Sequence, residues 1–161
     1  MLQVETEITK LLRPGSICVG LRGATKDEIL ESMLDTLEGH RAVIDLEKVR
    51  EDVASREKIM STGVGQGLGL PHAKTAGVTE TMAVFAVTEE PIEFRAIDDE
   101  PVRLLFMLLG PETSRSQHIK VLSRISRLMN RHQIRDALLA ARSPDEVVEI
   151  LSDGELDLMD R

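Results

Sequence analysis

The sequence predicts an α/β fold in which helices cover both faces of one β-sheet. Short apolar runs alternate along the chain with segments of helical periodicity, a pattern typical of α/β domains. Residues 102–109 are apolar at nearly every position, which indicates a strand buried on both faces. The last third of the chain carries apolar residues at helical spacing. A chain of 161 residues is long enough to form one domain with a sizeable core.

The N-terminal part of the chain predicts a strand between two helical segments. Residues 4–12 suit a short helical turn that ends before a Pro-Gly pair, and residues 16–21 form an apolar run of strand type. Thr25 and Glu28 have the spacing of a capping box, so we expect a helix to begin there. Gly39 suits the end of this helix, because glycine readily adopts the left-handed conformation that closes helices.

The middle of the chain predicts a second helix and several strands. Asp45 is expected to cap the helix, and Arg56 falls near its end. A glycine-rich loop follows. Residues 68–71, 82–88 and 92–94 are predicted as strands, of which the first and the last are short. These strands would join the buried strand in one sheet.

Three helices are predicted in the last third. Four residues of the first helix share one face at spacings of four, three and four: His118, Leu122, Ile125 and Met129. The second helix spans the apolar positions of residues 134–141. Ser143 and Glu146 form another capping box around a proline at the first helical position, and this final helix is predicted to end at Leu151.

Composition narrows the classes of function. We expect a single domain over residues 1–152, followed by an acidic, flexible tail at residues 153–161. The formal net charge of −8 argues against general nucleic-acid binding, which needs a basic surface. Cys18 is the only cysteine, which excludes an intrachain disulfide and fits a reducing cytoplasm. No apolar run is long enough to cross a bilayer and no signal peptide is evident, so we expect a cytoplasmic protein without membrane insertion.

The most informative segment is a glycine-rich loop that leads into a histidine. Residues 61–74 read Ser-Thr-Gly-Val-Gly-Gln-Gly-Leu-Gly-Leu-Pro-His-Ala-Lys, with glycine at every second position from Gly63 to Gly69. Such a loop can present free backbone N–H groups to an anion. The alternative is a surface loop in which several residues need positive φ angles. The spacing matches neither the dinucleotide-binding glycine fingerprint nor the Walker phosphate loop.

Two histidines are candidates for chemistry on phosphate. His72 follows a proline, and a neutral imidazole can accept a phosphoryl group on one nitrogen while the other makes a hydrogen bond. The alternative for His72 is a structural histidine at the end of a strand. His118 lies on an apolar helix face, where it is either a core residue or a second histidine of the same site.

Three further side chains lie close to the loop in sequence. Arg56 is either a charge partner for phosphate or a solvated arginine at a helix end. Ser61 and Thr62 can donate hydroxyl hydrogen bonds to a ligand or cap the turn. No group of His, Asp and Glu residues has metal-ligand spacing, so neither a metal nor a cofactor is expected.

The combined pattern resembles a known family. The runs Ser55-Arg56-Glu57, Ser-Thr-Gly-Val-Gly-Gln-Gly and Leu70-Pro71-His72 resemble the IIA component of the bacterial phosphoenolpyruvate-dependent phosphotransferase system. The class is the fructose–mannitol one, which includes the nitrogen-regulatory IIA proteins. The resemblance runs from about Leu11 to Leu151. It implies a single mixed β-sheet flanked by helices on both faces.

The resemblance also implies roles for the candidate residues. His72 would accept a phosphoryl group from phospho-HPr or from its nitrogen-branch counterpart. His118 would orient and hydrogen-bond that group, and Arg56 would neutralise its charge. The implied phosphate loop consists of Ser61, Thr62, Gly63, Gly65 and Gly67. Gln66 stands where many members carry Asn, a departure that leaves the histidine in place.

Three functions stay open on this basis. A phosphocarrier in sugar uptake would pass its phosphoryl group from His72 to a cysteine of a IIB partner. A regulatory binding module would change its protein contacts with the phosphorylation state of His72, without any sugar. A binder of nucleotides or other anions would use only the glycine loop, and its binding would persist when His72 is replaced by alanine.

Overall fold

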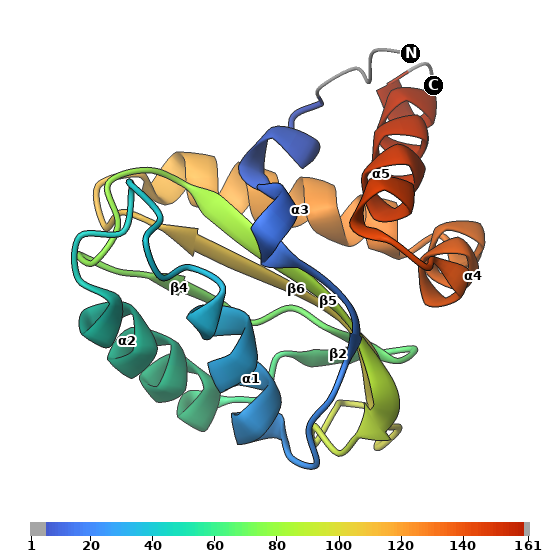
Figure 1. The fold of residues 1–161 in the computed structure, drawn as a ribbon, viewed down its shortest axis with the longest axis horizontal. Coiled ribbons are helices and arrows are strands. Elements are labelled where there is room, and N and C mark those ends of the chain that lie inside the picture. Colours follow the sequence, from blue (N-terminus) through green and yellow to red (C-terminus); the bar gives the residue numbers. More distant parts are fainter. Residues whose placement is uncertain (1–5, 160–161) are drawn as a thin grey trace.

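A six-stranded mixed sheet lies between two layers of helices in the computed structural model, which describes residues 6–159 (Figure 1). The strands run in the order β1-β5-β6-β3-β2, and β4 also pairs with β6. Their bounds are β1 Ile17–Leu21, β2 Gly63–Gly65, β3 Leu68–Gly69, β4 His72–Lys74, β5 Met82–Ile92 and β6 Val102–Gly110. β5 and β6 are antiparallel, whereas β3 and β4 run parallel to β6 and β1 runs parallel to β5. This confirms the predicted mixed sheet.

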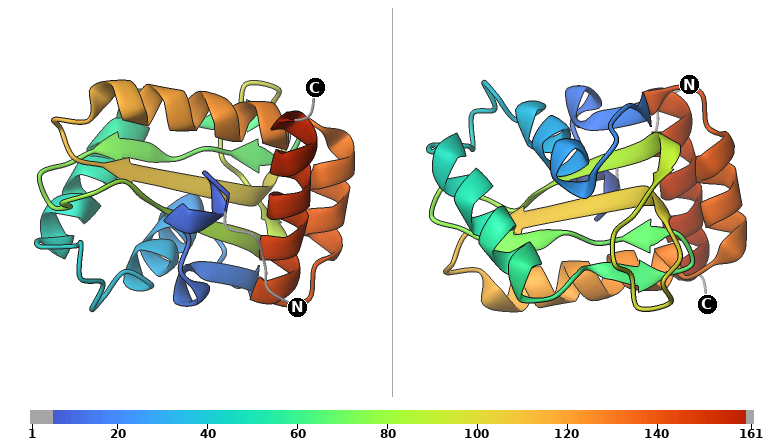
Figure 2. Two further views of the ribbon diagram at one scale, coloured as in Figure 1. Left: turned by 90° about the horizontal axis from the view of Figure 1, so that it is seen from above. Right: turned by 90° about the horizontal axis from the view of Figure 1, so that it is seen from below.

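Helices cover both faces of this sheet (Figure 2). Their bounds are α1 Lys26–Asp35, α2 Leu46–Ile59, α3 Arg115–Met129, α4 His132–Ala140 and α5 Pro144–Met159. Apolar residues of α1 and α2 pack on one face, and those of α3, α4 and α5 pack on the other. The strand β6 serves both layers, because Leu105 and Met107 belong to the first core while Phe106 and Leu108 belong to the second. The prediction of a strand buried on both faces is therefore confirmed.

The predicted helix caps form as expected. Thr25 Oγ1 accepts a hydrogen bond from the backbone N–H of Glu28 at 3.2 Å, and Asp45 Oδ1 accepts one from Lys48 at 3.1 Å. At the start of α5, Ser143 Oγ accepts the N–H of Glu146 at 3.2 Å. These local bonds fix where the helices begin, which is why the sequence alone located them.

Two predicted boundaries are wrong. The strand expected at 82–88 continues as β5 to Ile92, past an irregularity in its pairing with β6, and the separate strand expected at 92–94 does not form. The last helix was expected to end at Leu151, but α5 extends to Met159 and takes in most of the expected tail. At the N-terminus the expected helical turn is a 3₁₀ turn over Thr9–Leu11, and residues 4 and 5 lie outside the described part of the chain.

Tertiary contacts explain the longer α5. Glu155 is fully buried, accepts the backbone N–H of Ile8 at 3.0 Å and pairs with Arg124 at 2.8 Å. Gly154 is buried against Ile134 and the α3 residue Leu128, both so close that a Cβ would collide with them. An acidic and glycine-containing segment is thus held against the domain by partners far away in sequence. Within residues 6–159, no helix is long and apolar enough to span a bilayer.

Candidate active site

His72 begins β4, a strand whose partner within the described residues is β6 (register His72↔Leu108). The next residue, Ala73, is buried in the core beneath α1 and α2. Because side chains alternate along a strand, His72 and Lys74 point to the other face, where α3 lies. His72 is half-buried and Lys74 is exposed. The fold therefore holds the imidazole against the sheet while leaving part of it accessible.

One hydrogen bond sets the tautomer of His72. Its Nδ1 lies 2.8 Å from the carbonyl oxygen of Leu70. A carbonyl oxygen can only accept, so Nδ1 carries the proton and, in the neutral ring, Nε2 carries the lone pair. The acceptor is itself fixed, since Leu70 N–H donates to Thr62 and the carbonyl of Pro71 accepts from Leu108, both at 2.9 Å. The result is a nucleophilic nitrogen with a defined orientation.

The structure brings His118 next to His72. Helix α3 packs against β6, and the centroids of the two imidazole rings are 5.9 Å apart with an angle of 49° between the ring planes. The side chain of His118 is only 4% exposed. Of the two interpretations of His118, the contact favours a second histidine of the same site.

The environment keeps His118 neutral. Burial, with smaller contributions from the nearby His72 and Lys74, lowers the pKa of His118 to about 4. At neutral pH the ring therefore carries no charge and has a single N–H to donate. A neutral imidazole next to His72 can donate a hydrogen bond to an incoming anionic group. Because it carries no charge, it does not repel a cationic group in the same site.

Arg56 lies in the last turn of α2, a helix that contacts β4, the strand that carries His72. Arg56 Nη1 donates to the carbonyl of Met60 at 3.0 Å, and no hydrogen bond joins it to His72 within residues 6–159. Its role in neutralising phosphate stays a prediction.

The glycine-rich loop forms a hairpin. β2 and β3 pair antiparallel, and Gln66 and Gly67 between them have φ angles of 59° and 76°. Two consecutive residues with positive φ form the tight turn that matches the twist of the strands. Asp98 accepts the N–H of Gln66 at 2.9 Å, which pins the turn to a neighbouring loop.

The first residues of the loop use their donors within the protein. Ser61 Oγ donates to the carbonyl of Phe94 at 2.5 Å and accepts the N–H of Gly63 at 3.1 Å. Thr62 donates its N–H and its hydroxyl to the carboxylate of Glu57, at 2.8 and 2.6 Å. The assignment of Ser61, Thr62 and the glycines as a phosphate loop stays a prediction, and these bonds favour the alternative for Ser61 and Thr62, that they cap the turn.

Glu57 holds the start of the glycine-rich loop in place. It belongs to the recognised run Ser55-Arg56-Glu57, but the sequence predicted no role for it. It is 9% exposed, and besides Thr62 it binds Lys26 Nζ at 2.5 Å. Lys26 in turn lies over the ring of Phe94, 4.4 Å from its centroid. This network ties the end of α2 to the hairpin, so the motif residue next to Arg56 stabilises the loop that leads to His72.

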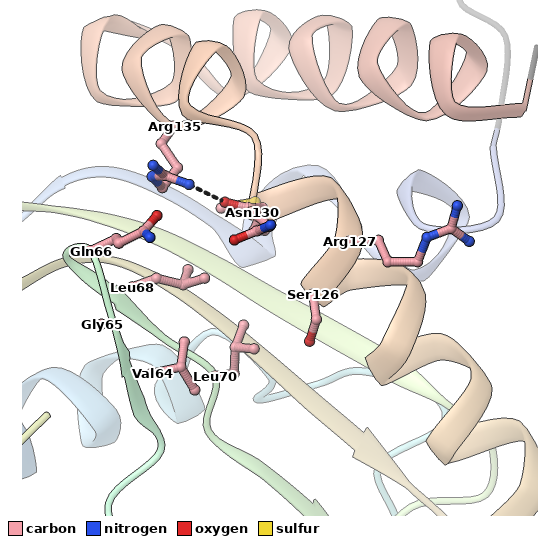
Figure 3. A pocket seen from close by; sticks show the side chains of 10 residues that line it. Val64, Gly65, Gln66, Leu68, Leu70, Ser126, Arg127, Asn130 and Arg135 are labelled. Atoms are coloured by element: carbon pink, nitrogen blue, oxygen red, sulfur yellow. Dashed lines mark hydrogen bonds between the residues drawn. The ribbon is translucent and has the colours of Figure 1, made fainter. Parts of the chain in front are cut away.

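A cavity of about 390 Å³ lies between the hairpin and the end of α3 (Figure 3). Leu68, Leu70 and Met129 give it apolar walls, and Arg135 stands at its rim, donating to the carbonyl of Met129 at 3.0 Å. A second hollow of about 1000 Å³ lies between α1 and α2. His72 lines neither of them. The half-buried His72 is partly accessible to a partner, whereas the neighbouring His118 is buried.

No group of three His, Cys, Asp or Glu side chains within residues 6–159 could hold a metal ion. The groups of this site that can carry chemistry are the imidazoles of His72 and His118. The fold and this pair of histidines define an α/β domain that presents one imidazole nitrogen, backed by a second, neutral imidazole. The chain belongs to the family described as "Phosphoenolpyruvate-dependent sugar phosphotransferase system, EIIA 2", whose family model matches residues 10–154.

Curated relatives carry two kinds of name. The chain is 38% identical over 130 residues to the "PTS system fructose-specific EIIA component" of Haloferax volcanii, covering 81% of this chain and 84% of the relative. It is 30% identical over 146 residues to the "Nitrogen regulatory protein" of Pseudomonas aeruginosa, covering 91% and 95%. The fructose-specific EIIABC component of Bacillus subtilis is 32% identical over 91% of this chain, which spans only 23% of that longer protein.

Solved structures agree with the fold. The nitrogen regulatory protein IIA-Ntr of Neisseria meningitidis superposes with a TM-score of 0.82 at 34% identity, over 88% of this chain and 97% of that one. Enzyme IIA-mannitol of Escherichia coli, solved in complex with phosphorylated enzyme IIB-mannitol, gives a TM-score of 0.75 at 24% identity, over 88% and 97%. The fold expected from the resemblance is confirmed.

Proposed function

We propose that this protein carries a phosphoryl group on Nε2 of His72, accepted from phospho-HPr or from its nitrogen-branch counterpart. The observation that supports this most is the hydrogen bond from His72 Nδ1 to the carbonyl of Leu70, which leaves the lone pair on Nε2. Membership of the phosphotransferase EIIA family supports this choice of phosphoryl donor. It also supports a cytoplasmic location, where the protein would meet that donor.

The transfer is a displacement at phosphorus. The lone pair of His72 Nε2 forms the new N–P bond as the N–P bond to the donor histidine breaks, and the donor nitrogen keeps that electron pair. The single N–H of neutral His118 donates to a phosphoryl oxygen, and Arg56 supplies positive charge from α2. His72 Nδ1 keeps its proton on the Leu70 carbonyl throughout, which holds the ring in line with the donor.

Two outcomes of phosphorylation are compatible with this site. In the first, the phosphoryl group passes to a IIB component, as the complex containing IIA-mannitol suggests for this fold. In the second, phospho-His72 changes contacts with regulatory targets. The likeness to nitrogen regulatory proteins supports this outcome, while the likeness to a fructose-specific EIIA component supports the first. Both require the same acceptor atom, so they differ in what happens after transfer.

A relay assay tests the proposal. The protein would be incubated with labelled phosphoenolpyruvate, enzyme I and HPr, beside His72→Ala and a control, His132→Ala, which replaces an exposed histidine of α4. Acid-labile label on the parent and the control, but not on His72→Ala, is the expected result. Label retained by folded His72→Ala would refute the assignment.

A chase separates the two outcomes. Adding a cognate IIB domain to the labelled protein should move the label to a cysteine of that domain if the protein serves sugar uptake. Label that stays on His72 in the presence of the IIB domains of the same organism would favour the regulatory role.

A further inference from the structure

Two buried polar atoms without a partner lie next to Gly110 at the back of the site. Within residues 6–159, His118 Nδ1 and Thr81 Oγ1 are both inaccessible to solvent and make no hydrogen bond. A Cβ atom built on Gly110 would lie 3.2 Å from His118 Nδ1 and 3.4 Å from Thr81 Oγ1. Both atoms therefore border the same small space above the Gly110 backbone. Leaving two such groups unpaired would cost stability, whereas pairing them with each other satisfies both.

The sheet places this pair. Thr81 directly precedes β5, and the pairing of Met82 with Leu109 sets it opposite Gly110 at the end of β6. On the other side of β6, the N–H of Thr75 donates to the carbonyl of Gly110 at 2.8 Å, which anchors this end of the strand. The absence of a side chain at Gly110 leaves the room in which His118 and a hydroxyl can meet.

We propose that the Thr81 hydroxyl donates a hydrogen bond to Nδ1 of His118 and thereby holds the proton of the neutral ring on Nε2. Thr81 would be a positioning residue that acts through His118, and this role rests on the proposed phosphoryl transfer.

The tautomer matters because a neutral imidazole has one N–H. His118 is neutral because it is buried, and the charged or titratable groups that act on it are His72 and Lys74, both of which disfavour a second proton. If that one proton moved to Nδ1, the nitrogen left for the phosphoryl group would be an acceptor facing anionic oxygens. A hydroxyl that donates a hydrogen bond to Nδ1 keeps the proton from moving there, so the ring remains a donor at Nε2.

Nitrogen-15 NMR of the histidine rings tests the bond without any phosphoryl transfer. The spectra would compare the unphosphorylated parent protein with Thr81→Val, which keeps the shape but removes the hydroxyl, and with Thr81→Ser, which keeps the hydroxyl. The parent and Thr81→Ser should show His118 as the Nε2–H tautomer, while Thr81→Val should show a substantial Nδ1–H population. Thr81→Ala provides a second hydroxyl-free variant if the valine variant does not fold.

Transfer kinetics test the consequence. In Thr81→Val, kcat for phosphoryl acceptance should fall about tenfold, the scale of one lost hydrogen bond, with KM for phospho-HPr unchanged. Thr81→Ser should stay within about twofold of the parent. An unchanged His118 tautomer in folded Thr81→Val would overturn the inference, and so would a tautomer change with no effect on kcat. If the parent accepts no phosphoryl group, the proposed function fails, and the spectra still decide whether the bond exists.

Discussion

Replacing His118 should remove a specific part of the acid sensitivity of the fold. Its pKa is lowered from 6.5 to about 4 in the folded protein. Between these two values the unfolded chain binds more protons than the folded protein, so stability falls as the pH falls. The part of the free energy of unfolding that depends on a neutral His118 is fully present above pH 6.5. It is lost progressively as the pH falls toward 4. At pH 4.5 the loss amounts to about 2–3 kcal/mol, because the buried ring is little screened by solvent.

The assay is urea denaturation at pH 7.5 and pH 4.5 of the parent, of His118→Gln and of His132→Gln. Glutamine is polar and does not titrate, so His118→Gln should lose about 2–3 kcal/mol less free energy of unfolding over this interval than the parent. The control should behave like the parent, because His132 is exposed. Carboxylates titrate in all three proteins and cancel in the difference. Equal losses in the parent and His118→Gln would refute the assignment of a buried, neutral His118.

Substitutions at three other positions, with their controls, test the last turn of α2 and the loop that leads to His72. Arg56→Ala should slow phosphoryl acceptance about 100-fold in rapid-quench assays, and Arg56→Lys less, because a positive charge near the transferring group is lost or kept; an unchanged rate would make Arg56 a solvated helix residue. Gly63→Ala should cost about 1–3 kcal/mol in urea, since its Cβ would lie 2.7 Å from that of Ala96, whereas Gly15→Ala, with open space around it, should change little. Glu57→Gln should cost about 1–3 kcal/mol and expose the loop to hydrogen exchange, because buried donors lose their carboxylate; unchanged protection would contradict the network.

Local signals located most of the fold. The caps at Thr25, Asp45 and Ser143 are bonds between residues three positions apart, and such bonds can be read from sequence. The end of α5 could not be read from the sequence. Glycine usually interrupts a helix and glutamate is usually solvated, so Gly154 and Glu155 suggested that the helix ends before them. They are held in the helix by contacts with residues 20 or more positions away.

The candidate site, like the fold, has parts that the sequence indicates and parts that only tertiary contacts determine. Composition and resemblance pointed to His72, and the resemblance also gave His118 a role beside it. The pairing of β4 with β6 and the packing of α3 on β6 bring the two together, and neither contact has a local signal in the sequence. Glu57 stood inside the recognised motif, yet its partner Lys26 comes from a different helix. Thr81 and Gly110 carry no sequence feature of their own, and only their register in the sheet connects them to the histidines.

The most direct test of the central claim identifies the phosphorylated atom. The protein would be labelled with nitrogen-15 in its histidine rings, phosphorylated with phosphoenolpyruvate and catalytic amounts of enzyme I and HPr, and examined by nitrogen-15 and phosphorus-31 NMR. The account predicts a single phosphohistidine, His72, with phosphorus bonded to Nε2 and the proton still on Nδ1. Phosphorus on Nδ1 of His72, or on any other histidine, would contradict it.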